Sequence, residues 1–231
     1  MQAEFKKVLL PAIGKVFRDI SGKGPEKLYV QSIGNIIVVN IYGYLTIGLA
    51  ESKLLDDMLM SSATITYYSK VVHNSLESVQ IVLKEKFRVD VRNTLCDFEV
   101  KENHGVIFYE LNKNVESDSA ISGAYYNFVR SRITEIFRKN TGAYPNSIDA
   151  YKCNGDVLIK VSGFLGSFNE TKFRYDEEMV NANKVFYYRM LKNELKTILN
   201  DFNTENYYFI KAYCDVNMLD DFALIYLKGD E

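Results

Sequence analysis

The sequence has no tryptophan, three prolines and three cysteines among its 231 residues. The cysteines are odd in number and form no C-x-x-C pair, so neither a disulfide framework nor a thiolate metal site is indicated. No apolar run approaches the length that spans a bilayer, and residues 1–10 lack the apolar core of a signal peptide. We therefore expect reduced thiols, a cytoplasmic location and no direct membrane insertion.

Net charge is also small. The 28 basic and 30 acidic residues leave a formal charge of −2, which provides no overall basic field for nucleic acid or an anionic membrane. Core-forming residues are plentiful, because 47% of the chain is hydrophobic and it contains 17 tyrosines and 14 phenylalanines. This composition is typical of packed globular domains, and the length allows one large domain or two of ordinary size.

The two halves of the chain are diverged copies of each other. When the sequence is shifted by 120 residues, helix stripes, turn glycines and strand centres coincide without a gap. The matched pairs include Ile13 with Ile133, Phe17 with Phe137, Gly22 with Gly142, Pro25 with Pro145, Gly43 with Gly163, and Tyr67-Tyr68 with Tyr187-Tyr188. After a slip of two residues, Cys96-Asp97 falls on Cys214-Asp215. A period this long, repeated twice, indicates a duplicated domain.

The order α-β-β-α-β-β is predicted for each copy, over about residues 1–114 and 115–231. Apolar spacing at i, i+3 and i+4 predicts two helices per copy, and Pro11 predicts a kink or a late start in the first. Gly-Asn at 34–35 and Asn-Gly at 154–155 predict type II′ and type I′ hairpin turns. We expect an α+β fold in which each copy is a mostly antiparallel four-stranded sheet with helices on one face. The two copies are expected to pack as a pseudo-dimer within one chain. That chain is expected to be a monomer or to form a further homodimer.

Asp97 and Asp215 are the most prominent polar pair, since both copies keep them at the same place. A repeated carboxylate could line a pseudo-symmetric site between the copies, as an acid, a base or a cation ligand. The structural alternative, which we favour, is that each Asp lies at a strand end and bonds the backbone of the following turn.

Aromatic and imidazole side chains are weaker candidates. Tyr68 and Tyr188 could form a ligand platform, although core packing at the start of the second helix is the simpler interpretation. The two histidines are not duplicated and have no neighbouring cysteine or carboxylate pair, so no metal site is expected. We predict that His104 lies in a hairpin turn and His73 on a helix surface.

No catalytic motif is evident. Gly22-Lys23-Gly24-Pro25 follows a helix and lacks the spacing of a phosphate-binding loop, so a helix stop is its expected role. No nucleophile-elbow or dinucleotide-binding glycine motif occurs in a suitable strand context. We therefore expect no cofactor and no enzymatic activity, and an enzyme of unrecognised type is left open.

Taken together, these features resemble those of a known family. The chain has Gly-Lys-Gly-Pro after an amphipathic helix, then a hairpin, a strand ending in Gly-x-Leu-Thr at residues 43–46, Glu51, a second helix and a closing strand pair with an Asp. This order is similar to the MpsC-like family, a bacterial domain formerly of unknown function. The resemblance covers the first copy nearly end to end and the second more loosely, since Gly142-Ala143-Tyr144-Pro145 replaces the loop.

The resemblance implies an accessory role. The family name refers to a cation-linked, membrane-potential-generating system associated with inorganic-carbon uptake, in which this component would be a soluble partner of membrane subunits. No catalytic residue is carried over. The leading hypothesis is a non-enzymatic adaptor protein. The alternative is a small-molecule or ion sensor whose site lies between the copies, near Asp97, Asp215 or the tyrosine pairs.

Overall fold

The computed structural model describes residues 2–45, 57–99, 102–115, 120–165, 177–204 and 207–229. The side chains of residues 2–3, 57–70, 153 and 177–179 are not among those described. The chain divides into two compact units, Met1–Ser117 and Asp118–Glu231, and each is considered by itself.

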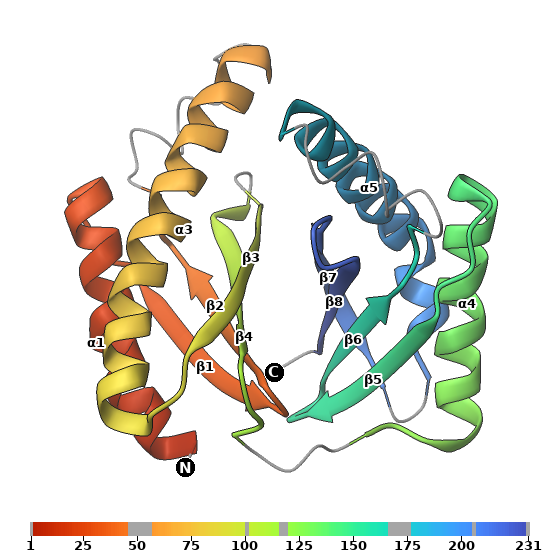
Figure 1. Ribbon diagram of the computed structural model, residues 1–231, viewed down its shortest axis with the longest axis horizontal. Helices are drawn as coiled ribbons and strands as arrows, with labels where there is room; N and C mark the ends of the chain where they lie inside the picture. The colour runs from red at the N-terminus through yellow and green to blue at the C-terminus, as the bar shows by residue number, and fades with distance from the viewer. Residues whose placement is uncertain are drawn as a thin grey trace. The chain divides into compact units, whose positions relative to one another are not determined.

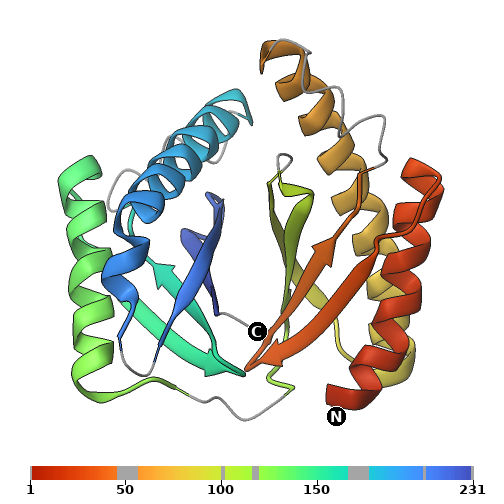
Figure 2. The ribbon, with the colours of Figure 1, turned by 180° about the vertical axis from the view of Figure 1, so that it is seen from behind.

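In its described residues, the first unit is a four-stranded antiparallel sheet with two helices (Figure 1). Its elements in chain order are α1 (Gln2–Ser21), β1 (Lys27–Ile33), β2 (Ile36–Tyr42), α3 (Asp57–Phe87), β3 (Val91–Glu99) and β4 (His104–Leu111). The strands lie in the order β1-β2-β4-β3, so both hairpins sit side by side with β2 and β4 in the centre. The two helices lie next to each other, as the view from behind also shows (Figure 2).

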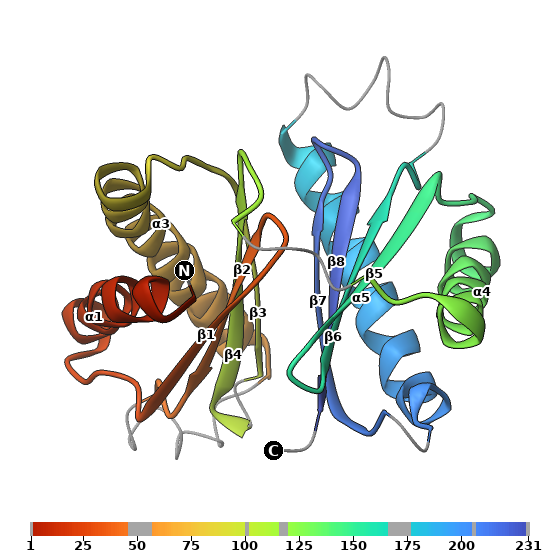
Figure 3. The same cartoon turned by 90° about the horizontal axis from the view of Figure 1, so that it is seen from below.

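The second unit repeats this architecture. Its elements are α4 (Gly123–Thr141), β5 (Ser147–Cys153), β6 (Asp156–Ser162), α5 (Glu177–Ile198), η4 (Leu199–Phe202), β7 (Phe209–Asn217) and β8 (Phe222–Gly229). The sheet order β5-β6-β8-β7 is the order of the first unit. In each unit both helices cover one face of the sheet (Figure 3). The predicted α+β fold with two α-β-β-α-β-β units is therefore confirmed.

Equivalent strands also pair in equivalent registers. Val39 of β2 lies opposite Ile107 of β4, and Ile159 of β6 lies opposite Ile225 of β8. The third strand of each sheet has a register shift near its start. Val39 and Ile159 are 120 positions apart, whereas Ile107 and Ile225 are 118 apart. The third strands, which begin at Val91 and Phe209, are also offset by 118, so the two-residue slip lies between the second and third strands of a unit.

One hydrophobic core per unit lies between the sheet and its helices. In the first unit it is built from α1 residues such as Phe17, from α3, and from alternate strand residues such as Val39 and Ile107. Because successive strand residues point to opposite faces, the residues between them face away from the helices. Pro11 lies inside α1, which begins at Gln2, so the predicted late start is wrong.

Local turn chemistry follows the sequence closely. Gly34 has a φ of 58°, whereas in the second unit Asn154 and Gly155 have φ values of 49° and 89°. One positive φ at the first turn position matches type II′, and two match type I′, as predicted. The helix stop is also confirmed, since Gly22 has a φ of 74° and donates its backbone N–H to the carbonyl of Arg18 at 2.8 Å.

Candidate functional site

The predicted carboxylates lie inside the edge strands of the two sheets. Asp97, in β3, lies opposite Val106 of β4, and Asp215, in β7, lies opposite Leu224 of β8. The two aspartates are 2% and 3% exposed. Bonding of the following turn stays a prediction for Asp97, and Oδ1 of Asp215 accepts the N–H of Val216 within β7. In the second unit that role belongs to Asn217, whose side-chain oxygen accepts the N–H groups of the turn. Asp97 and Asp215 belong to different units, so a site shared by both stays a prediction.

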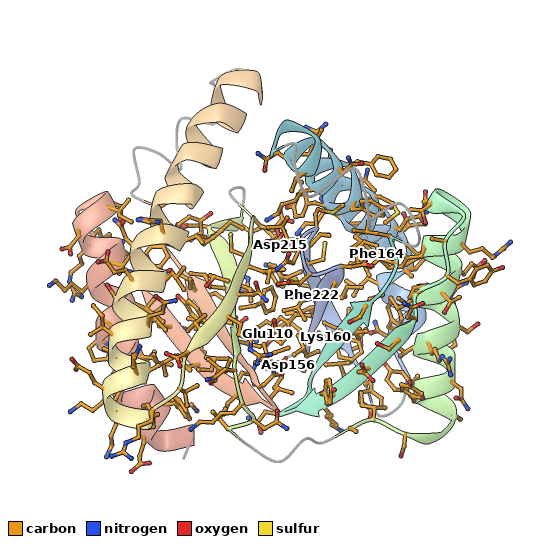
Figure 4. The ribbon with its side chains drawn as sticks, viewed as in Figure 1. Glu110, Asp156, Lys160, Phe164, Asp215 and Phe222 are labelled. Carbon is orange, nitrogen blue, oxygen red and sulfur yellow. The ribbon has the colours of Figure 1, made fainter. Side chains whose placement is uncertain are left out.

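Asp215 forms an ion pair that the sequence did not predict. Nζ of Lys184, on α5, lies 3.3 Å from the carboxylate, and the N–H of Val216 donates to Oδ1 at 2.7 Å. The Asp215 side chain is 4% exposed and that of Lys184 is 44% exposed (Asp215 is labelled in Figure 4). The pair therefore joins a buried anion to a cation that remains in contact with water.

A second lysine of α5 lies over the same strand. Nζ of Lys192 is 5.3 Å from the ring centroid of Tyr213, and the whole residue is 8% exposed. Residues 184 and 192 are about two helical turns apart, so they lie on the same side of α5. The aligned positions in the first copy hold Thr64 and Val72, so this pair of cations is a feature of the second unit. In the sequence, the two lysines are marked only by this difference from Thr64 and Val72.

The tyrosine candidates have different outcomes. Tyr68 lies in α3, but its side chain is outside the described residues. Tyr188 of α5 is partly buried and packs against the core of the second unit. Its neighbour Tyr187 lies 5.2 Å from Phe164 between ring centroids, and burial raises the pKa of Tyr187. The position of Tyr188 therefore matches the core-packing interpretation.

The histidines are separated in the first unit. His73 is exposed on α3, as predicted. The turn position predicted for His104 is wrong, because this residue begins β4 and stacks on Tyr42 at 4.0 Å between ring centroids. The turn instead closes at Asn103, which takes a left-handed φ of 51°. Asparagine tolerates that conformation and is a common turn residue for this reason.

Asn103 and its counterpart Asp221 hold the chain where it leaves the second strand. Asn103 Oδ1 accepts the N–H of Leu45 at 2.8 Å, and Asp221 Oδ1 accepts the N–H groups of Phe164 and Leu165, both at 3.0 Å. Sequence reasoning missed this pair, although both copies carry an Asn or Asp there. Thr46 and Glu51, which contributed to the family resemblance, lie outside the described residues.

Within the described ranges, no group of three or more His, Cys, Asp or Glu side chains is placed to hold a metal ion. Of the helices in the part of the chain that the structure describes, none combines the length and apolar character needed to cross a membrane.

Residues 2–113 match the family model described as "Na+-translocating membrane potential-generating system (MpsC)". The first unit belongs to the MpsC family. The match begins in α1 and ends just after β4, so it covers all the elements of the first unit. This confirms the resemblance to MpsC-like proteins. Searches of curated proteins and of solved structures returned no significant match.

Proposed function

We propose that this chain is a cytoplasmic, non-enzymatic adaptor that binds a membrane-protein subunit of a cation-linked system for membrane potential or inorganic-carbon uptake. The observation that carries the proposal is the match of the complete first unit to an MpsC family model, whose description names Na+ translocation and membrane potential. The second unit, which repeats the same fold, would extend the surface available to such a partner.

The residues behind the family resemblance support a role through surface rather than chemistry. Gly22 ends α1, and Gly43, with a φ of 62°, turns the chain after β2. Leu45 is 8% exposed and its backbone is held by Asn103. Each of these residues shapes the backbone or fills the core, so none of them is a candidate for carrying out chemistry.

The test is affinity capture of the tagged full-length chain from detergent-solubilised membranes of its native host. The expected result is co-purification of a multi-spanning subunit, together with a lowered Na+-dependent membrane potential in cells that lack this chain. Failure to capture such a subunit, with an unchanged potential, would overturn the proposal.

Matched surface variants can assign the contact to one unit. Ile81 on α3 and Phe186 on α5 are each 52% exposed, so a glutamate at either position should leave the fold intact. Because the family match lies in the first unit, Ile81→Glu is expected to weaken capture more than Phe186→Glu. The reverse order would assign the contact to the second unit.

A further inference from the structure

A row of four side chains crosses the helix-covered face of the first sheet. Strand pairing places Ser32 of β1 opposite Ile37 of β2, Ile37 opposite Tyr109 of β4, and Tyr109 opposite Thr94 of β3. Ile37 and Tyr109 belong to the hydrophobic core, and directly opposite residues share a face, so the whole row points toward the helices. Three of the four carry a hydroxyl group, which is uncommon on the core side of a sheet.

The hydroxyl groups of this row are shielded from water and lack protein partners. In the part of the chain that the structure describes, the hydroxyl oxygens of Ser32, Thr94 and Tyr109 are buried and form no hydrogen bond. Tyr109 as a whole residue is 0% exposed. Nearly all buried polar groups in folded proteins are hydrogen-bonded, because an unpaired one lowers stability. These hydroxyls therefore require a partner that the protein side chains around them do not supply.

The helix α3 places a further hydroxyl near Tyr109. Ser75 lies between Val71 and Val79 on the core-facing side of α3, since a spacing of four residues keeps side chains on one face, and all three are 0% exposed. The Ser75 hydroxyl donates to the carbonyl of Val72 at 3.0 Å, which leaves its oxygen able to accept a hydrogen bond. Burial is the main cause of the raised pKa of Tyr109, and Ser75 is near enough to affect that pKa as well.

The second unit has apolar side chains at the equivalent places. The replacements are Ser75 by Leu195, Thr94 by Ala212, and Tyr109 by Leu227. Ala212 and Leu227 again lie directly opposite each other, and all three replacements contribute to the core of the second unit. Because the same fold closes this layer with apolar side chains, the architecture does not require hydroxyl groups there.

We propose that the hydroxyls of Tyr109, Thr94 and Ser75 form a buried water-binding site between α3 and the sheet of the first unit. Water both donates and accepts hydrogen bonds, and a buried water typically makes about three of them to polar groups that would otherwise be unpaired. Ser32 is separated from Tyr109 by Ile37 and is not part of the site. The bound water connects α3 to β3 and β4, a connection that apolar packing replaces for α5 in the second unit.

The direct test is oxygen-17 magnetic relaxation dispersion of the full-length chain, which detects water molecules held for longer than the protein takes to tumble. The parent is compared with the triple variant Ser75→Ala, Thr94→Val and Tyr109→Phe, in which each substitution removes one hydroxyl with little change of shape. Loss of a long-lived water from the triple variant is expected, because an apolar cavity stays dry. An unchanged number of long-lived waters would overturn the proposal.

A double-mutant cycle of Thr94→Val and Tyr109→Phe gives an independent readout. Each single variant removes one of the hydrogen bonds to the water and is expected to lower the melting temperature by roughly 2–4 °C. The double variant should lose less than the sum of the two shifts, because groups that share a partner are not additive. The control cycle of Ser21→Ala and Tyr109→Phe should be additive, since the Ser21 hydroxyl donates directly to the carbonyl of Phe17 at 2.7 Å.

Coupling between Thr94 and Tyr109 together with loss of a long-lived water supports the proposal. Additivity overturns it, as does a single variant that is as stable as the parent. Coupling without loss of water also overturns it, because the hydroxyls would then bond each other directly. If the triple variant does not fold, a crystal structure of the parent decides. Ordered water within about 3.2 Å of both hydroxyl oxygens supports the site, and a dry layer overturns it.

Discussion

Tyr125 at the start of α4 stacks on Tyr207, which precedes β7, with ring centroids 4.1 Å apart and planes 7° from parallel. The first unit has the same contact at positions 120 residues earlier, where Phe5 stacks on Phe87 at 4.2 Å. The stack ties the first helix of each unit to the segment that enters the third strand. It is the clearest side-chain relationship that both units have kept, although the sequences differ at both positions.

Replacing Tyr207 by alanine should destabilise the second unit by roughly 2 kcal/mol, since it removes both a stacking partner and partly buried ring area. It also removes the ring over which Nζ of Lys152 lies, 4.7 Å from the centroid. Urea unfolding measures the loss. Tyr208→Ala is the matched control, because that ring is 62% exposed and its removal should cost far less. Equal losses would show that the stack contributes nothing.

The side chain of Asp221 should stabilise the second unit, because it accepts hydrogen bonds from the backbone N–H groups of Phe164 and Leu165. Asp221→Gly keeps the left-handed backbone, which has a φ of 50°, and removes the acceptor, so a cost of about 1 kcal/mol is expected. Asp221→Ala adds backbone strain and should cost about 2 kcal/mol. Asp221→Asn keeps the acceptor and should resemble the parent. A glycine variant as stable as the parent would contradict this account.

Stability should fall at alkaline pH, and Tyr109 should be one cause. Burial raises the pKa of Tyr109. Because the native state holds this proton more tightly than the unfolded state, the stabilisation is complete below the ordinary tyrosine pKa of about 10 and is lost as the pH rises above it.

The measurement is urea unfolding of the parent and of Tyr109→Phe between pH 7 and pH 11. The variant lacks this titrating group, so its stability should decline less steeply above about pH 10. Tyr125 and Tyr187 also have pKa values raised by burial, so some decline should remain. Identical slopes in the parent and the variant would exclude a contribution from Tyr109.

In the ion pair between Lys184 and Asp215, loss of the lysine should lower stability more than loss of the aspartate. Lys184→Met leaves a carboxylate that is 4% exposed without its cation, and a cost of about 1–2 kcal/mol is expected. Asp215→Asn keeps an oxygen for the N–H of Val216 and leaves a lysine in contact with water, so it should cost less than about 1 kcal/mol. Thermal unfolding of both variants tests the order, and a reversed order would contradict it.

Much of the fold could be predicted because its determinants are local. Periodicity located the helices, and Gly34 with Asn35, like Asn154 with Gly155, specified the turn type through the φ values those residues tolerate. The prediction for His104 was wrong for a related reason. The turn needed a left-handed residue, and Asn103 was the better candidate of the two neighbours.

The candidate site was predicted less well, because it depends on contacts between distant parts of the chain. Matching Asp97 with Asp215 located a position that both copies preserve, but it did not show that Lys184 reaches one of them. Nor did it show that the turn is bonded by Asn217. A sequence comparison identifies equivalent positions, whereas the partners of a side chain depend on which strands are neighbours.

By itself, the sequence determined the duplication, the order of elements, the hairpin turns and the helix stops, because backbone preferences and apolar periodicity act over a few residues. Only the tertiary structure decided that Tyr125 meets Tyr207, that Asp221 holds Leu165, and that Lys184 reaches Asp215. These features follow from the sheet order β1-β2-β4-β3 and its repeat, which bring residues far apart in the chain onto one surface. No local preference encodes such an arrangement.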